Sequence, residues 1–181
     1  MLILSQRRLD TLDNIIILGN NMKCHANIKQ FTKKNKAVGN AMKKIKKKSF
    51  TKKYIAFKNS YKKDSSVKNG NIKHIGSTTI DGILAKPILD LLYVVNDIPK
   101  NSVGKFADDD RFDRCVHIND TWSIMSGEKM NLHIVKKNSK KYNSLIKFKG
   151  LLKNKKIRDE YIELKRQNKR SKTSDYKNAF F

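Results

Sequence analysis

The chain has 181 residues, of which 38% are hydrophobic, enough for one modest core and for one or at most two domains. It carries 41 Lys plus Arg against 16 Asp plus Glu, and this net charge of +25 favours polyanionic partners such as RNA, DNA or nucleoside triphosphates. Two widely spaced cysteines suggest neither a disulfide framework nor a zinc site, and the apolar run at residues 15–18 is too short for a signal peptide or a membrane span. We therefore expect a cytoplasmic protein in a reducing compartment.

The positive charge is concentrated at the two ends of the chain. Residues 1–73 carry a net charge of +16, residues 74–135 carry −3, and residues 136–181 carry +12. Basic flanks of this kind are typical of nucleic-acid binding through phosphate contacts. The alternative is that Lys, Asn and Ile are abundant because of AT-rich coding, with Lys covering a solvated surface whatever the protein does.

Residues 1–53 are interpreted as a basic, Lys-rich extension that is poorly ordered or partly helical. Its stretch from Lys33 to Lys53 is dominated by charge and has no sustained apolar period. A nuclear-localisation or RNA-binding arm around residues 43–48 is the alternative. The folded domain is expected to occupy residues 54–181.

The predicted elements of this domain begin with a helix, in which Tyr54, Phe57 and Tyr61 recur at helical spacing. A turn at residues 68–71 ends it, and a short strand at residues 72–75 follows. The near-continuous apolar run at residues 88–95 predicts a strand buried on both faces.

The second half of the domain is predicted to contain a hairpin and two helices. Residues 97–120 are read as a helix or loop leading into more strands, with a solvated loop at residues 108–110. Residues 122–125 and 131–135 predict a β-hairpin. Two amphipathic helices joined near Asn154 are indicated by apolar residues at three- and four-residue spacing, namely Leu145, Phe148, Leu152, Ile157, Tyr161 and Leu164.

The main chemical motif is Gly76-Ser77 followed by Asp90 within the buried strand. A tight Gly-Ser turn exposes backbone N–H groups and a hydroxyl to phosphate oxygens. A carboxylate on the next strand can hold a hard divalent cation that bridges those phosphates. The spacing thus predicts a phosphate site beside a metal ligand. The alternative is that Asp90 is a buried carboxylate satisfied by backbone donors or by Lys86.

Residues 74–90, HIGSTTIDGILAKPILD, resemble the signature of GrpB-type proteins, which reads roughly HIGSTSVPGLAAKPIID. Residues 131–135 resemble the later LHVV strand of that family, residues 158–165 resemble its REYxxLK segment, and residues 174–181 its closing pattern. The first fifty residues are expected to have no counterpart.

The resemblance to the GrpB family, placed in the nucleotidyltransferase superfamily, implies an α/β (α+β) fold with a mixed sheet flanked by helices. It implies nucleotidyl transfer from a nucleoside triphosphate to an acceptor, with Mg²⁺ as cofactor and Asp90 as metal ligand and catalytic residue. Lys86 is expected to neutralise phosphate charge and to take part in catalysis. The phosphate-binding residues would be Gly76, Ser77, Thr78 and Lys86. The strand positions of His74 and His133 suggest that both line one cleft, and the alternative is that both are satisfied core histidines.

Two departures from the superfamily pattern bear on catalysis. A second carboxylate is expected two residues after Asp90, on the same face of the strand, but Leu92 stands there. The third carboxylate is also missing, since the matching strand offers Asn131 and His133. The sequence therefore leaves three interpretations open: an Mg-dependent nucleotidyltransferase, a catalytically inactive module that binds RNA or DNA through its basic flanks, and, on fold analogy alone, an antibiotic-modifying transferase.

Overall fold

The computed structural model describes residues 15–18, 22–25, 42–65, 67–98, 106 and 109–167. The C-terminal residues that resemble the closing pattern of the GrpB family lie outside this part, as does most of the Lys-rich stretch before residue 42. Within the described part, no helix is long and apolar enough to cross a membrane.

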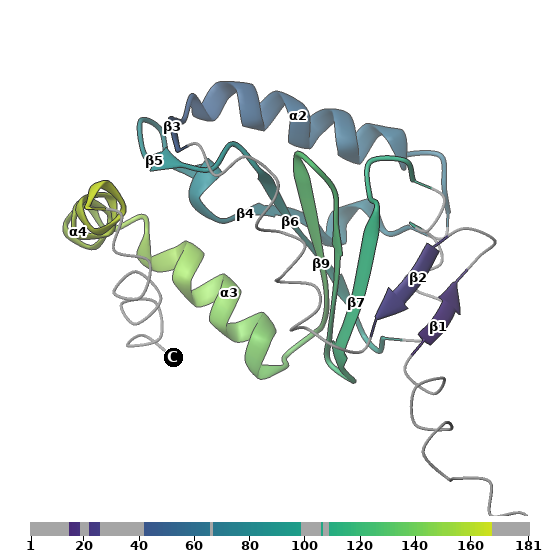
Figure 1. Cartoon of the computed structure of the whole chain (residues 1–181). Helices are drawn as coiled ribbons and strands as arrows, with labels where there is room; N and C mark the ends of the chain where they lie inside the picture. The colour runs from purple at the N-terminus through teal and green to yellow at the C-terminus, as the bar shows by residue number, and fades with distance from the viewer. Residues whose placement is uncertain are drawn as a thin grey trace, which may run out of the picture.

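A mixed seven-stranded sheet, counted over the described residues, forms the centre of the molecule, with strand order β1-β2-β7-β8-β9-β6-β4 (Figure 1). Its strands are β1 (Ile15–Leu18), β2 (Met22–His25), β4 (Ile72–Ile75), β6 (Leu89–Val95), β7 (Arg114–Asn119), β8 (Trp122–Ser126) and β9 (Met130–Lys136). The helices are α2 (Lys47–Ser60), α3 (Lys140–Leu151) and α4 (Lys155–Arg166). A two-stranded ribbon of β3 (Lys43–Lys44) and β5 (Leu84–Ala85), and the short 3₁₀ helices η2 (Asn69–Asn71) and η3 (Ser77–Thr79), complete these elements. The predicted α+β class is confirmed.

Strand β6 lies between β9, with which it is parallel, and β4, with which it is antiparallel. Its residues Leu91 to Val94 are all buried, because helices cover both faces of this part of the sheet. The predicted hairpin is also confirmed as β8 paired antiparallel with β9. The apolar runs therefore correctly predicted the strands that form the middle of the sheet.

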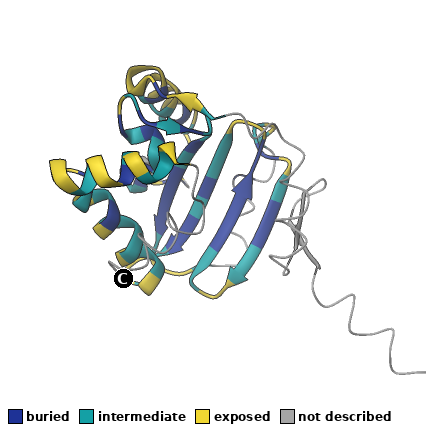
Figure 2. Cartoon of the chain, turned by 60° about the vertical axis from the view of Figure 1, so that its left-hand side comes forward, coloured by how far each residue is buried: buried dark blue, intermediate teal, exposed yellow. Residues whose placement is uncertain are grey.

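The two faces of the sheet pack against different helices. On one face, Leu91 lies in the main core with Phe50 and Phe57 of α2. On the other, Leu92 lies in a smaller cluster against which Leu145 of α3 and neighbouring residues of that helix pack. Figure 1 shows α2 and α3 on opposite sides of the sheet, and Figure 2 shows buried residues along the strands and exposed residues on the outer surfaces of the helices. The alternation of side chains along β6 thus divides the core in two.

The predicted pair of C-terminal helices is confirmed, with the junction at Asn154. Ser139 caps α3, since its side chain accepts a hydrogen bond from the backbone N–H of Tyr142. Asn154 caps α4 in the same way, accepting from the N–H of Ile157 at 3.3 Å. Each cap satisfies a backbone donor that the first turn of a helix leaves without an intrahelical partner. The caps therefore fix where both helices begin.

The predicted boundary between residues 53 and 54 falls inside α2, whose Phe50 lies in the same core as the sheet. The ribbon strand β3 and the buried Ile45 also precede this boundary. In residues 97–120, the structure adds a strand, β7, where the sequence suggested a helix or loop. Its side chains do not alternate between apolar and polar, which is why no strand was predicted there.

The cysteines differ from the expectation of a chain without disulfides. Cys115 is fully buried in β7 and is disulfide-bonded. Its Cα partner across the parallel β2–β7 pair is Cys24. The strand pairing brings together two residues that are 91 positions apart in the sequence, and their spacing alone could not show this.

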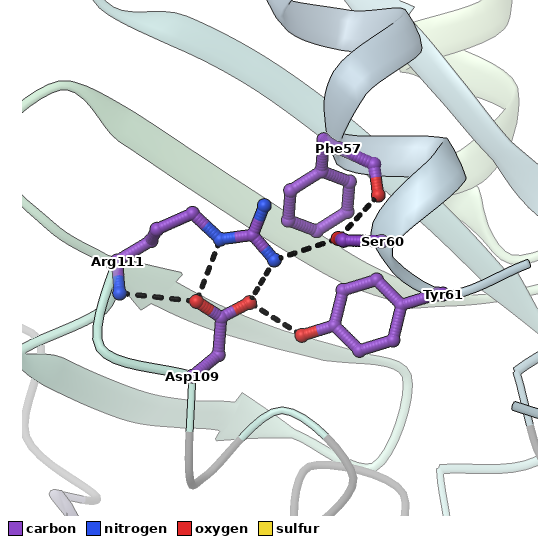
Figure 3. A network of polar contacts seen from close by, with 5 residues as sticks. All are labelled: Phe57, Ser60, Tyr61, Asp109 and Arg111. Atoms are coloured by element: carbon purple, nitrogen blue, oxygen red, sulfur yellow. Dashed lines mark hydrogen bonds and ion pairs between the residues drawn. The ribbon is translucent and has the colours of Figure 1, made fainter.

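The predicted solvated loop around Asp109 is wrong at that residue, which forms the centre of a polar network (Figure 3). The Asp109 side chain is only 5% exposed and accepts hydrogen bonds from Arg111 and from the hydroxyl of Tyr61. Arg111 also donates to Ser60 at 3.0 Å and lies over the Phe57 ring, 4.5 Å from its centroid. This network attaches the C-terminal end of α2 to the segment that precedes β7.

Candidate functional site

The Gly76–Ser77 turn lies directly against Asp90. Strand β4 pairs with β6 so that Ile75 lies opposite Asp90, and Gly76 follows with a φ of 78°. A Cβ atom at Gly76 would lie 2.6 Å from Asp90 Oδ2 and 3.1 Å from Asp90 Cβ. Only glycine therefore fits, both because of the left-handed backbone and because of the close carboxylate. The structure brings together the turn and the carboxylate that the motif predicted.

A row of polar side chains orients Asp90 from across the sheet. Asp90, Asn131 and Ser126 lie opposite one another on β6, β9 and β8, so their side chains share one face. Asn131 Nδ2 donates to Asp90 Oδ1 at 2.9 Å, and Ser126 Oγ donates to Asn131 Oδ1 at 2.7 Å. Because the buried Ser126 fixes the Asn131 amide, one carboxylate oxygen of Asp90 is held toward β9 while the other faces the turn.

These donors do not form a two-metal centre. Leu92, which stands at the position of the second carboxylate, is fully buried in the cluster beneath α3. Asn131, at the position of the third carboxylate, already uses both ends of its amide in the row. In the described parts of the chain, no three or more His, Cys, Asp or Glu residues are grouped so that they could hold a metal ion. One carboxylate, that of Asp90, is what the site offers to a cation.

The hydroxyl groups of the turn have different environments. Ser77 Oγ lies 3.1 Å from the hydroxyl of Tyr161 on α4, and the Ser77 residue is partly exposed. Thr78 is only 1% exposed, and its hydroxyl bonds the ring of His74 at 2.8 Å. Thr79 Oγ1 donates to the carbonyl oxygen of Gly76 at 2.7 Å and so stabilises the turn. Of these three, Ser77 is best placed to contact a ligand beside Asp90.

The expectation that His74 and His133 line one cleft is wrong. His74 lies opposite Leu91, whereas His133 lies opposite Leu92, so the two rings project from opposite faces of the sheet. His133 stacks on Trp122 with ring centroids 6.0 Å apart and accepts a hydrogen bond from the indole N–H. A one-residue difference in register separates two side chains that the sequence alone could not assign to faces.

The environment of His74 disfavours a positive charge on its ring. Burial, together with the positive charges of Lys149 and Lys47, lowers the pKa of His74 from 6.5 to about 4. Its Nε2 atom bonds the Thr78 hydroxyl, and the ring packs near Tyr54, with centroids 5.8 Å apart. At neutral pH His74 is therefore a neutral hydrogen-bonding group.

Lys86 lies in the short connection between β5 and β6 and is partly exposed. Its carbonyl oxygen accepts a hydrogen bond from the N–H of Ile88 at 2.9 Å, which tightens the bend at Pro87. Its ammonium group has no ion pair within the described residues.

The sequence did not predict a basic cavity of about 560 Å³ beside the turn. Residues from α2, β4, the segment around η3, α3, the α3–α4 connection and α4 line it: Lys47, Thr51, Tyr54, His74, Thr79, Ile80, Asp81, Lys149, Leu152, Lys153 and Arg158. Asp81, which occupies the usual proline position of the GrpB signature, accepts a hydrogen bond from the backbone N–H of Lys47 at 2.9 Å. The cations of this cavity come from Lys-rich stretches far apart in the chain, so no local pattern distinguishes them.

The fold and the site define an α+β protein in which a Gly-Ser turn packs against a carboxylate of the central sheet. The chain belongs to the GrpB family, because the family model described as "GrpB protein" matches residues 30–179. The expectation that the first fifty residues have no counterpart in this family is therefore wrong for residues 30–50, which the family model matches.

Two known proteins are similar to the chain. The "UPF0157 protein BH1888" of Halalkalibacterium halodurans is 31% identical over 108 residues, which cover 53% of this chain and 52% of that protein. The chain thus matches about half the length of this relative. The crystal structure of conserved protein GrpB from Enterococcus faecalis is 21% identical, with a TM-score of 0.46, over 72% of this chain and 83% of that one.

Proposed function

We propose that the chain binds a nucleoside triphosphate as its magnesium complex, with the phosphates at the Gly76–Ser77 turn and the cation at Asp90. The observation that supports this proposal most is the contact between the turn and the carboxylate, where a Cβ at Gly76 would lie 2.6 Å from Asp90 Oδ2. This contact supports the proposal because backbone N–H groups of a turn can donate to phosphate oxygens and a carboxylate beside the turn can hold Mg²⁺. Lys86, in the loop that precedes β6, is the proposed source of further positive charge.

A single nucleotide-bound magnesium ion is consistent with these residues. Mg²⁺ in nucleotide sites is commonly held by one or two carboxylates, by phosphate oxygens and by water. Asp90 supplies one carboxylate, and Asn131 and Ser126 hold it in place. When bound, the ion would neutralise the charge of the phosphates. The arrangement supports binding more strongly than two-metal transfer, because Leu92 and Asn131 replace the other two carboxylates.

A thermal-shift titration tests nucleotide binding directly, since a ligand specific for the native state stabilises it by mass action. Each nucleoside triphosphate is added with and without magnesium to the wild type, to Asp90→Asn and to the control Asp120→Asn, which removes an exposed carboxylate in the β7–β8 turn. We expect a magnesium-dependent rise in melting temperature in the wild type and the control that is lost in Asp90→Asn. An equal rise in all three proteins would show that the site is misassigned.

Nucleotidyl transfer to an acceptor is the reaction that the family resemblance implies, and release of pyrophosphate from a triphosphate would reveal it. The alternative is an inactive module that binds RNA or DNA through its basic flanks, which the +16 and +12 charges and the buried Leu92 favour. Affinity for an RNA oligonucleotide that falls steeply with added salt, without pyrophosphate release, supports this alternative. Salt-insensitive or absent binding contradicts it.

A further inference from the structure

The basic cavity contains four cations and one carboxylate. Lys47 comes from α2, Lys149 from α3, Arg158 from α4, and Lys153 from the connection between α3 and α4. The carboxylate, Asp81, is exposed and already accepts a hydrogen bond from the backbone N–H of Lys47. The cavity therefore carries a net charge of three positive units when His74 is neutral.

These four cations form no ion pair within the described part of the chain, although Arg158 lies close enough to Asp159 to lower the pKa of that carboxyl, after the larger effect of Lys155. None of the ion pairs between described residues includes Lys47, Lys149, Lys153 or Arg158. By contrast, the neighbouring Lys155 pairs with Asp159 at 2.8 Å on the outer surface of α4. The cavity thus concentrates positive charge that ion pairs among the described residues do not neutralise, which is what an anion site requires.

The fold holds one of these cations in a fixed position. Lys149 is half-buried, and its ammonium group donates to the carbonyl oxygen of His74 at 2.9 Å, which leaves further N–H donors for a ligand. Burial and the charges of Lys73, Lys153 and Lys47 lower the pKa of Lys149. The same field lowers the pKa of His74 to about 4, after the larger effect of burial. Both shifts show the repulsion that a bound anion would relieve.

We propose that this cavity binds the polyphosphate group of a small molecule, either free polyphosphate or the phosphate chain of a nucleotide. Its volume of about 560 Å³ lies within the range of small-molecule sites. The hydroxyls of Thr51 and Thr79 already donate to the carbonyl oxygens of Lys47 and Gly76, so the donors to phosphate oxygens are the ammonium and guanidinium groups that line the cavity. A chain of two or three phosphates matches the charge of the cavity better than a single phosphate does.

The cavity is distinct from the site at Asp90. Gly76, Ser77 and Asp90 do not line the cavity, and the His74 side chain that does projects from the face of the sheet opposite to Asp90. Thr79 connects the two sites, because it lines the cavity while its hydroxyl donates to the Gly76 carbonyl. The inference therefore does not depend on a metal at Asp90 and can be tested without magnesium.

Isothermal titration of the full chain with inorganic tripolyphosphate, in EDTA, tests the proposal. The double variant Lys153→Ala/Arg158→Ala removes two cavity cations whose side chains form no ion pair among the described residues, so the fold should survive. The control Lys129→Ala/Lys137→Ala removes two exposed cations near β9 and changes the net charge equally. This matched pair separates a local site from the general attraction of anions to a chain with a net charge of +25.

We expect one-to-one binding that weakens by about tenfold or more in the cavity variant and by less than about twofold in the control, because each lost cation removes a charge-assisted hydrogen bond. ATP in EDTA should compete with tripolyphosphate if the natural ligand is a nucleotide, and free polyphosphate is the ligand if it does not. Equal weakening in both variants, or no saturable binding, would overturn the proposal. The proposal would also be overturned if Lys153→Ala/Arg158→Ala weakened the binding of RNA but not the binding of tripolyphosphate.

Magnesium-ATP binding to Asp90→Asn, measured in parallel, keeps the two proposals separate. Loss of tripolyphosphate binding in the cavity variant with unchanged binding in Asp90→Asn supports the cavity, whatever happens at the metal site. If Asp90→Asn alone abolishes tripolyphosphate binding in EDTA, the anion binds at the Gly76–Ser77 turn and the cavity proposal is wrong.

Discussion

The buried ring of His74 should make the stability of this protein depend on pH. The ring is 8% exposed, and its native pKa is lowered to about 4 by burial and by Lys149 and Lys47. In the unfolded chain the pKa returns to 6.5, so below that pH the unfolded chain binds a proton that the native state excludes. The native state is therefore destabilised as the pH falls from 6.5 toward 4.

The size of this effect follows from the two pKa values. Between pH 8 and pH 5 the free energy of unfolding should fall by about 2 kcal/mol because of His74 alone, and the loss should level off near roughly 3 kcal/mol below pH 4. At pH 8 the ring is neutral in both states and contributes no pH dependence.

Urea unfolding of the wild type and of His74→Gln at pH 8 and pH 5 measures this contribution. Glutamine keeps a polar group near Thr78 and cannot titrate, so the fall in stability should be smaller in the variant by about 1 to 2 kcal/mol. His117→Gln is the matched control, because the partly exposed His117 ring also bonds a hydroxyl, that of Ser123 on β8 at 2.9 Å, and does not line the basic cavity. Equal pH dependence in the wild type and His74→Gln would refute the reasoning.

Three further changes should alter stability, each measurable by urea unfolding. Gly76→Ala should destabilise the fold by about 2 kcal/mol or more, because of its φ of 78° and the 2.6 Å approach to Asp90 Oδ2, and Asp90→Gly in the same chain should recover part of the loss. Asp109→Asn should cost about 3 kcal/mol, because it leaves Arg111 without its carboxylate in a largely buried network. Gly150→Ala should stabilise α3 by up to about 1 kcal/mol, since nothing lies within 4 Å of the added methyl group. Unchanged stability in any of these variants would contradict the structural environment from which its effect is derived.

The sequence predicted the elements whose pattern is strong and local. The run at residues 88–95 is apolar on both faces because it lies in the middle of the sheet. Strand β6 begins one residue later than this run and ends at the same residue. The C-terminal helices have regular apolar spacing and a capping residue at Asn154, and both were found where they were expected. In each of these segments, the side chains that face the core must be apolar, and this requirement produces a regular pattern within the segment itself.

Elements stabilised by distant partners were predicted poorly. Strand β7 pairs with β8 and β2, and its buried residues Cys115 and Val116 are adjacent, so no alternation indicates a strand. Asp109 looks like part of an acidic surface loop, yet the folding of α2 against that loop buries it beside Arg111 and Tyr61. In both cases the deciding interaction joins segments that are far apart in the chain.

The same distinction applies to the two candidate sites. The turn at Gly76 and the carboxylate of Asp90 are close in sequence and on neighbouring strands, so their spacing predicted the contact. The two histidines could not be assigned to faces, because a shift of one residue in strand register reverses a side chain. The motif therefore predicted which residues meet, but it did not predict which other groups surround them.

The basic cavity also bears on the question that composition left open, whether the lysines reflect function or only AT-rich coding. Lysines retained only for solubility should be exposed, as Lys155 is, and free to pair with nearby carboxylates such as Asp159. Lys149 is different, because it is half-buried and hydrogen-bonded to the backbone of β4, and its pKa is lowered first by burial and then by Lys73, Lys153 and Lys47. A bound anion would relieve the repulsion between these cations. The excess of lysine is therefore uninformative along the sequence but supports the proposed anion site at the cavity where the fold gathers four cations around one carboxylate.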